Sequence, residues 1–180
     1  MSPRIGIMQG RLSRPINNRI QSFPLNSWEV EFYLAKEIGF ELIEWVLDEN
    51  IQDNPILNKK YFSKINFVKN ETGININSIC CDYFMKNSLS KNSKSFSEKN
   101  LEIMNFLIEE SCPLNNIKII DLPLVGEESL KWKKISEDYK NVLLKLEKKI
   151  LGNNLMVALE TDLGPYELKD FLKNFNKNAV

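Results

Sequence analysis

The sequence predicts an α/β fold in which five short apolar strands alternate with five amphipathic helices. The strand centres fall near residues 6, 43, 77, 119 and 157, so they are about 34 to 42 residues apart. Strict alternation of strand and helix implies parallel strands that are joined by right-handed crossovers. The 180 residues can bury a sizeable core. We therefore treat residues 1–180 as a single domain.

The first two units are marked by strand patterns in "RIGIMQG" and "FELIEWV" and by glycines that end the helices. The first helix is expected to begin after "FPLNS", where Asn26 or Ser27 can cap its first turn, and to end at Gly39. The second helix is expected to end at Gly73. The apolar residues at helical spacing are Trp28, Phe32 and Ala35 in the first helix and Tyr61, Ile65 and Val68 in the second.

The other three units follow the same pattern. The third strand, "INSICCDYF", precedes a polar loop over residues 85–95, after which Ser95 and Glu98 could form a capping box. The fourth strand, "IKIIDLPLV", precedes a helix that should end at Gly152, and the fifth, "LMVAL", precedes a helix with Pro165 in its first turn. The inward-facing residues expected in these helices are Leu101, Met104 and Ile108, then Tyr139, Val142, Leu143, Leu146 and Ile150, then Leu168, Phe171, Leu172 and Phe175.

Two architectures fit five such units. One is an open, doubly wound, flavodoxin-like sheet, which this length would complete, and the other is the first five units of a (β/α)8 TIM barrel of about 250 residues. The turn after the first strand, "MQGRLSRP", lacks the Gly-rich phosphate signature of a nucleotide-binding sheet. Every strand instead ends in polar side chains, as at a barrel active site: Gln9, Arg11, Glu44, Asp82, Asp121, Glu160 and Asp162. The barrel is favoured, although ligands also bind at the strand ends of open sheets.

Composition argues against several classes of protein. Lys plus Arg and Asp plus Glu both number 24, so no basic surplus attracts nucleic acid or an acidic membrane. No apolar stretch approaches the roughly 18 residues of a membrane span. Cys80, Cys81 and Cys112 lack the spacing of a zinc site and are expected to be reduced core thiols of a cytoplasmic protein. The chain has no histidine, so its own chemistry depends on carboxylates, Lys, Tyr, Cys or a metal held without imidazole.

Four segments carry a resemblance to a known family: "IGIMQGRLS", "EIGFELIEWVLD", "INSICCDYFM" and "VALETDLGPYEL". In order and spacing, from Arg4 to Phe175, they resemble the xylose isomerase-like TIM barrels, which include sugar phosphate isomerases, ketose 3-epimerases and inosose dehydratases. The resemblance implies a divalent metal, Mn, Co, Mg or Zn, at the carboxyl face. Its ligands would be Glu, Asp, His or Gln, and Glu from strands five to eight, and only Glu160 matches this set.

The resemblance therefore implies the N-terminal five-eighths of a barrel, truncated at its C-terminus. We expect such a chain to bind metal poorly, to be inactive alone, and to self-associate or recruit a complementary C-terminal fragment. The implied function is a sugar or sugar-phosphate isomerase or epimerase that moves a proton next to a carbonyl through an enediolate. The alternatives are an endonuclease IV-like phosphodiesterase, which would need histidines and a basic surface, and a flavodoxin-like binding module.

The implied site residues have structural alternatives. Glu160 would be both metal ligand and proton carrier, and its alternative is a surface carboxylate. The substrate-binding candidates are Gln9, Arg11, Glu44 and Asp82. Gln9 and Arg11 could instead be a solvated loop pair, and Glu44 could belong to a structural ion pair. Turn roles are expected for Asp82 and Asp121, and a turn or cap role ahead of the Pro165 helix for Asp162.

Overall fold

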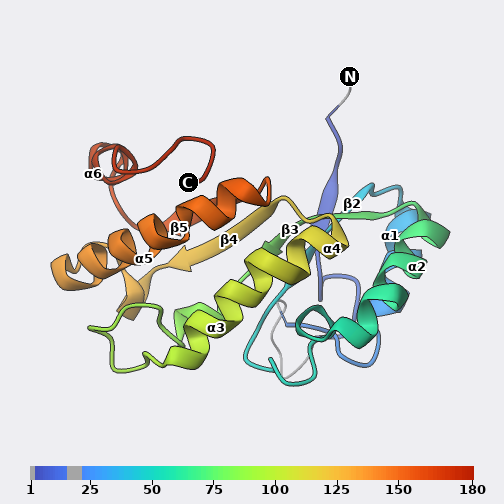
Figure 1. Ribbon diagram of the computed structural model, residues 1–180. Coiled ribbons are helices and arrows are strands. Elements are labelled where there is room, and N and C mark those ends of the chain that lie inside the picture. Colours follow the sequence, from blue (N-terminus) through green and yellow to red (C-terminus); the bar gives the residue numbers. More distant parts are fainter. Residues whose placement is uncertain (1–2, 16–21) are drawn as a thin grey trace.

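A computed structural model describes residues 3–15 and 22–180. Its core is one parallel sheet with the strand order β1-β2-β3-β4-β5 (Figure 1). The strands are β1 (Gly6–Met8), β2 (Leu42–Val46), β3 (Asn75–Cys80), β4 (Ile119–Leu124) and β5 (Met156–Thr161). This sequential order is that of a partial TIM barrel, and the flavodoxin-like alternative is wrong because its sheet would be reordered.

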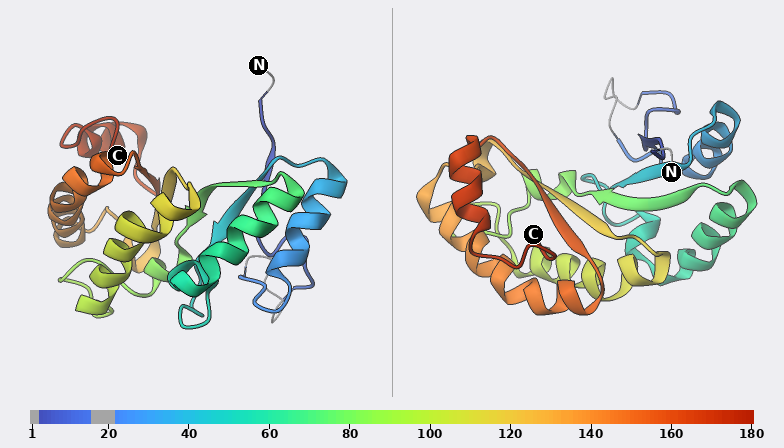
Figure 2. Two further views of the ribbon diagram at one scale, coloured as in Figure 1. Left: turned by 45° about the vertical axis from the view of Figure 1, so that its right-hand side comes forward. Right: turned by 90° about the horizontal axis from the view of Figure 1, so that it is seen from above.

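The helices follow the strands and cover one face of the sheet. They are α1 (Trp28–Ile38), α2 (Phe62–Thr72), α3 (Glu98–Phe106), α4 (Cys112–Asn115), α5 (Lys133–Gly152) and α6 (Pro165–Leu172). A π-helical turn, Leu107–Ser111, joins α3 to α4. Figure 2 shows the strands as a curved sheet with helices along its outer side. None of the helices in the described ranges is long and apolar enough to span a membrane.

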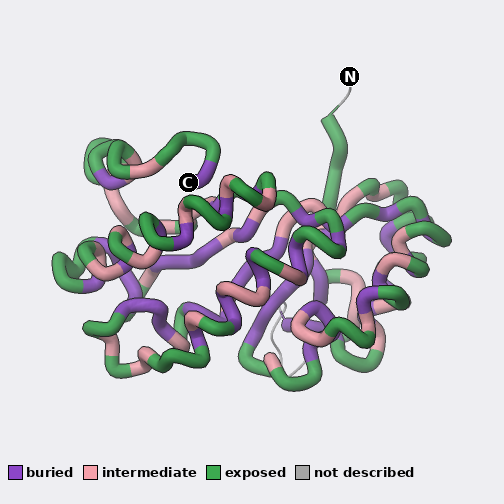
Figure 3. Tube along the Cα trace, viewed as in Figure 1, coloured by how far each residue is buried: buried purple, intermediate pink, exposed green. Residues whose placement is uncertain are grey.

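Alternation along the strands divides the sheet into a helix-covered face and a concave face. Ile43 and Trp45 of β2 are buried in the core under the helices, whereas Glu44 between them is only half-buried. In β4, Ile120 and Leu122 are likewise buried on either side of the half-buried Asp121. Figure 3 shows the centre of the sheet buried and the outer turns of the helices exposed. The concave face therefore carries the polar residues of the strands.

The glycine stops of the first two helices and the apolar stripe of α1 are confirmed. In α2, Ile65 and Val68 are buried as expected, but Tyr61 is half-buried and lies in the 3₁₀ turn before the helix. Gly39 and Gly73 follow α1 and α2 with φ of 95° and 77°, the left-handed conformation that suits glycine at a helix end. The stripe of α1 is buried as expected, at Trp28, Phe32 and Ala35. The three cysteines are free and buried, which confirms that they are core thiols.

Two local predictions were wrong. The third strand ends at Cys80 rather than Phe84, because the chain turns into a 3₁₀-helix, Asp82–Met85, as Tyr83 N–H bonds to the Leu47 carbonyl. Ser95 does not cap α3: the cap position belongs to Ser97, and the Ser95 hydroxyl accepts from Ser88 N–H at 3.2 Å. The predicted end of the fourth helix is confirmed: Gly152 is the last residue of α5, and the left-handed turn after it is made by Asn154 (φ 53°).

Candidate functional site

Carboxylates from neighbouring strands gather on the concave face, near the carboxyl ends of the strands. Glu44 comes from the middle of β2, Asp121 from β4 and Glu160 from β5, while Asp82 follows β3. Each of the three strand residues alternates with residues of the helix-covered core, which directs its side chain to the other face. Parallel strands bring their carboxyl ends to one edge, so residues far apart in sequence meet there.

Asp121 is the electrostatic centre of this group. It lies in register with Cys80 of β3 and Ala158 of β5. Burial, and then the negative charges of Glu44, Glu160 and Asp82, raise its pKa to about 6. The turn role expected for Asp121 is wrong, because the residue is inside a strand that pairs on both sides. Burial together with three neighbouring carboxylates makes Asp121 a candidate site residue, which sequence reasoning had assigned to a turn.

Glu44 and Asp82 have hydroxyl and thiol partners on the concave side. The Ser78 hydroxyl donates to Glu44 Oε1 at 2.7 Å, so the partner observed for Glu44 is a neutral group and not the cation of a structural ion pair. The Cys80 thiol contacts Asp82 Oδ1 at 3.3 Å. Asp82 does lie in a turn, the start of the 3₁₀-helix, and it also lines a cavity at this edge.

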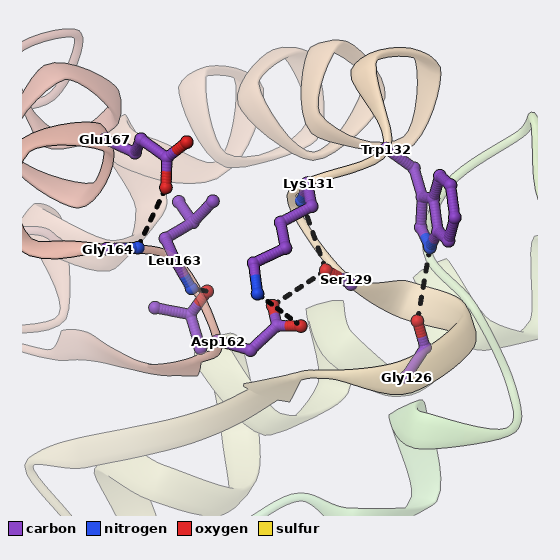
Figure 4. Close-up of polar contacts among 9 residues, drawn as sticks. Gly126, Ser129, Lys131, Trp132, Asp162, Leu163, Gly164 and Glu167 are labelled. Carbon is purple, nitrogen blue, oxygen red and sulfur yellow. Dashed lines mark hydrogen bonds and ion pairs between the residues drawn. The ribbon is translucent and has the colours of Figure 1, made fainter.

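Glu160 and Asp162 lie at the carboxyl end of the last strand but differ in their surroundings. Glu160 is exposed and pairs in register with Pro123. Asp162 accepts from the Ser129 hydroxyl at 2.7 Å and lies 3.5 Å from Lys131 Nζ (Figure 4). The cap role expected for Asp162 is wrong, because α6 is capped by Glu167, whose carboxylate accepts from Gly164 N–H at 2.9 Å. Asp162 instead ties the end of β5 to the loop after β4.

Gln9 and Arg11 follow β1 and take different positions. Gln9 is only 1% exposed, and its Oε1 accepts from Val46 N–H at 3.1 Å, which extends the β1–β2 ladder by one rung. Its Nε2 has no hydrogen-bond partner in the described part of the chain. Arg11 is exposed on the following loop. The predicted solvated pair is therefore wrong for Gln9, and a substrate contact by either residue stays a prediction.

Glu31 is a buried carboxylate that sequence reasoning missed. It lies on the core side of α1 and is 1% exposed. Its two oxygens accept from Gly10 N–H at 3.0 and 2.9 Å, and Oε1 also accepts from Leu12 N–H at 3.1 Å. Burial raises its pKa, although the backbone amides act in the opposite direction. The available signal was a glutamate within the apolar stripe of a helix, next to Phe32.

Comparison with known proteins places this arrangement in one fold. No protein-family model matches the chain, and no curated protein matches it. Among solved structures, it aligns with the 3-keto-D-glucoside 4-epimerase of E. coli with a TM-score of 0.61 at 16% identity, over 87% of this chain and 56% of that one. It also aligns with a Mycobacterium smegmatis xylose isomerase-like TIM barrel protein in complex with magnesium, with a TM-score of 0.64 at 17% identity, over 95% of this chain and 60% of that one. For a D-tagatose 3-epimerase-like protein the TM-score is 0.66 at 13% identity, over 97% of this chain and 62% of that one.

The chain has the fold of part of a xylose isomerase-like TIM barrel. At these identities the likeness concerns the fold alone. The chain spans about 60% of the length of these solved structures, which agrees with five strands of an eight-stranded barrel. In a TIM barrel, the carboxyl ends of the strands form the face that carries the active site. The carboxylates of this xylose isomerase-like sheet lie at that face.

The carboxylates of this xylose isomerase-like sheet are the kind of ligand that binds a hard divalent cation, but too few of them lie close together to hold one. Glu44, Asp82, Asp121 and Glu160 offer carboxylate oxygens, the ligands that Mg²⁺ and Mn²⁺ prefer. Within residues 3–15 and 22–180, however, no three His, Cys, Asp or Glu side chains converge closely enough to hold a metal ion. The described residues therefore do not form a complete metal centre.

Proposed function

We propose that this chain is part of a sugar or sugar-phosphate isomerase or epimerase that moves a proton at the carbon next to the sugar carbonyl, through an enediolate. The observation that carries the proposal is that Glu44, Asp121 and Glu160 share the concave face of a xylose isomerase-like sheet, where the charges of Glu44 and Glu160 add to the effect of burial on the pKa of Asp121. One solved example of this fold is a 3-keto-D-glucoside 4-epimerase. Because the chain spans under two thirds of that structure, the activity is proposed for the complete barrel.

Glu160 is assigned the proton-carrying role. It is exposed at the end of an edge strand, where a sugar carbon can approach its carboxylate from the concave side. Glu160 is also proposed as one oxygen ligand of a divalent metal, Mg, Mn, Co or Zn, since the Mycobacterium structure was solved with magnesium. Such a cation, when bound, stabilises negative charge on the sugar oxygen. The other ligands would have to come from outside this chain.

The remaining residues are assigned to binding. Glu44 and Asp82 can accept hydrogen bonds from sugar hydroxyls, and Arg11 is exposed on the loop after β1. Gln9 Nε2 has no hydrogen-bond partner among the described residues, and it could donate to a substrate oxygen. Asp121, whose pKa is raised to about 6, keeps a proton further toward neutral pH than an ordinary aspartate and can donate to a sugar oxygen.

A chimaeric barrel tests the proposal. Residues 1–180 are joined to the part of the E. coli epimerase that follows its matched region, and D-fructose or D-tagatose is incubated with it in deuterated water with Mg²⁺ or Mn²⁺. Proton NMR should show exchange of a hydrogen next to the carbonyl. Glu160→Gln should slow the exchange by about 100-fold or more, as for loss of a general acid–base. Glu102→Gln, which changes an exposed carboxylate on α3, should leave the rate unchanged.

Two outcomes contradict the proposal. A chimaera that unfolds cooperatively as a single barrel but exchanges no sugar hydrogen would exclude this chemistry. Full exchange in Glu160→Gln would remove Glu160 from its assigned role. A nuclease role is not favoured by any observation, since the carboxylates at this face would repel a phosphodiester backbone.

A further inference from the structure

A cavity of about 560 Å³ lies among the loops that follow β2, β3 and β4, at the carboxyl ends of the strands. Its side chains include Asp48, Glu49, Asp82, Met85, Lys86 and Glu127. Four of these six are carboxylates and one is an ammonium group. The cavity is therefore negatively charged, and its volume is within the range of small-molecule sites.

The lysines around the cavity are already paired with carboxylates. Lys86 forms an ion pair with Glu49, which lines the same cavity. Lys131, on the neighbouring loop, lies 3.5 Å from Asp162 Oδ2. An anionic ligand would have to compete with these carboxylates for each ammonium group.

Three backbone amides of the segment between β1 and α1 are likewise occupied by the chain's own carboxylates, one of which, Asp48, lines the cavity. Proteins often bind phosphate with clustered N–H groups at such turns. Here the N–H groups of Gly10 and Leu12 bond to Glu31, and Phe23 N–H bonds to Asp48 at 3.0 Å. A phosphate arriving at these turns would meet filled donors and a negative charge.

We infer that this cavity receives the uncharged, hydroxyl-rich end of a sugar and excludes a phosphate group. The inference rests on the proposed function. It restricts the substrate to sugars that carry no phosphate group on the part that enters this cavity. Carboxylates accept hydrogen bonds from sugar hydroxyls, and such charge-assisted bonds are strong. The side chain of Met85, which is 39% exposed, offers an apolar surface to sugar C–H groups. A phosphate ester carries a charge of about −1.5 to −2 at neutral pH, which the four carboxylates repel.

The test compares a sugar with its own phosphate ester on the full chain. Nitrogen–proton NMR spectra are recorded with D-fructose, D-fructose 6-phosphate and inorganic phosphate as separate probes. D-Fructose should shift the amide signals of Lys86 and Gly126, which line the cavity, and D-fructose 6-phosphate should bind at least about ten-fold more weakly. Inorganic phosphate should not compete with D-fructose.

Variants of the ion pair sharpen the test. Glu49→Gln removes the partner of Lys86 and should strengthen binding of the phosphate ester relative to D-fructose. Glu102→Gln, which changes an exposed carboxylate on α3, should alter the binding of neither D-fructose nor its phosphate ester. Tighter binding of the ester by the unmodified chain, or competition by inorganic phosphate, would overturn the inference and leave the proposed function standing. Failure of both sugars to shift the cavity signals would overturn the inference together with the sugar site.

Discussion

The main-chain N–H of Val157 in β5 donates a hydrogen bond of 2.7 Å to the carbonyl oxygen of Ala179. Ala179 is fully buried at this contact. Met156 N–H, one residue earlier, bonds in the opposite direction to Lys118, at the start of β4. Alternation along a parallel strand therefore points the N–H groups of Leu159 and Thr161 to the same side as that of Val157. This side is the open edge of the sheet, where β5 has no further strand in the described residues.

The open edges predict self-association of the isolated chain. Strand edges with unpaired N–H and C=O groups readily pair with other chains. Sedimentation velocity should show a weight-average mass that rises with protein concentration. Met156→Lys, which places a charge beside the edge, should reduce the association because inward-pointing charges oppose edge pairing.

A matched variant distinguishes the effect of a charge at the edge of the sheet from the effect of added charge elsewhere on the surface. Leu144→Lys on α5 replaces a side chain of similar exposure, 40% against 41% for Met156, on the outer helical layer. It should leave the association unchanged. A chain that stays monomeric at all concentrations would contradict the prediction.

Weak metal binding is predicted for the chain by itself. Without three converging ligands in its described part, a carboxylate such as Glu160 cannot compete with water for Mn²⁺. Calorimetric titration with Mn²⁺ should give no stoichiometric binding in the micromolar range, and Glu160→Gln should give the same curve. Micromolar binding that Glu160→Gln abolishes would show that more ligands converge on Glu160 than the structure brings together.

Asp121→Asn is predicted to stabilise the fold at neutral pH. The native pKa of Asp121 is about 6 against an ordinary value of 3.8, so between these values the folded state binds more protons than the unfolded state. The free energy of unfolding therefore falls as pH rises from about 4 to 6, and the asparagine variant escapes this loss. A gain of about 1 kcal/mol would raise the melting temperature by about 2–4 °C at pH 7.5.

The gain from Asp121→Asn should shrink toward pH 4, where the native aspartate is already protonated. Asp170→Asn is the control of opposite sign, because Lys173 lowers the pKa of that exposed aspartate. Asp170 contributes stability above its unfolded pKa that is lost on acidification, so its removal should not raise the melting temperature at pH 7.5. An equal gain from Asp121→Asn at both pH values would rule out a charge effect.

Glu31→Ala is predicted to be strongly destabilising. The substitution leaves the buried N–H group of Gly10 without an acceptor, which costs about 1–3 kcal/mol, and also frees the half-buried N–H group of Leu12. Urea denaturation should show a clearly lower midpoint. Glu29→Ala on the same helix breaks only an exposed ion pair with Lys64 and should cost at most about 1 kcal/mol. Similar losses from the two variants would contradict the loop-anchoring role of Glu31.

Sequence periodicity was sufficient for the fold class and for most of the elements. The strand pattern of "LIEWV" and the helical spacing of Trp28, Phe32 and Ala35 each depend on residues a few positions apart, and the structure confirms both. The left-handed stops at Gly39 and Gly73 also follow from local backbone sterics. Local patterns failed where a distant partner competed, as with Ser95, which bonds to Ser88 instead of capping α3.

The sequence by itself determined which residues form strands and helices and that carboxylates end the strands, because both depend on local alternation and spacing. Only the tertiary structure decided which carboxylates act together. Burial raises the pKa of Asp121 most, and the charges of Glu44, Glu160 and Asp82, which lie 39 or more positions away in the chain, raise it further. Glu31 finds its amides 19 and 21 residues earlier. Burial and charge interactions depend on which residues are neighbours in space. The spacing of residues in the sequence does not reveal these neighbours, because they meet only when parallel pairing brings the strand ends together.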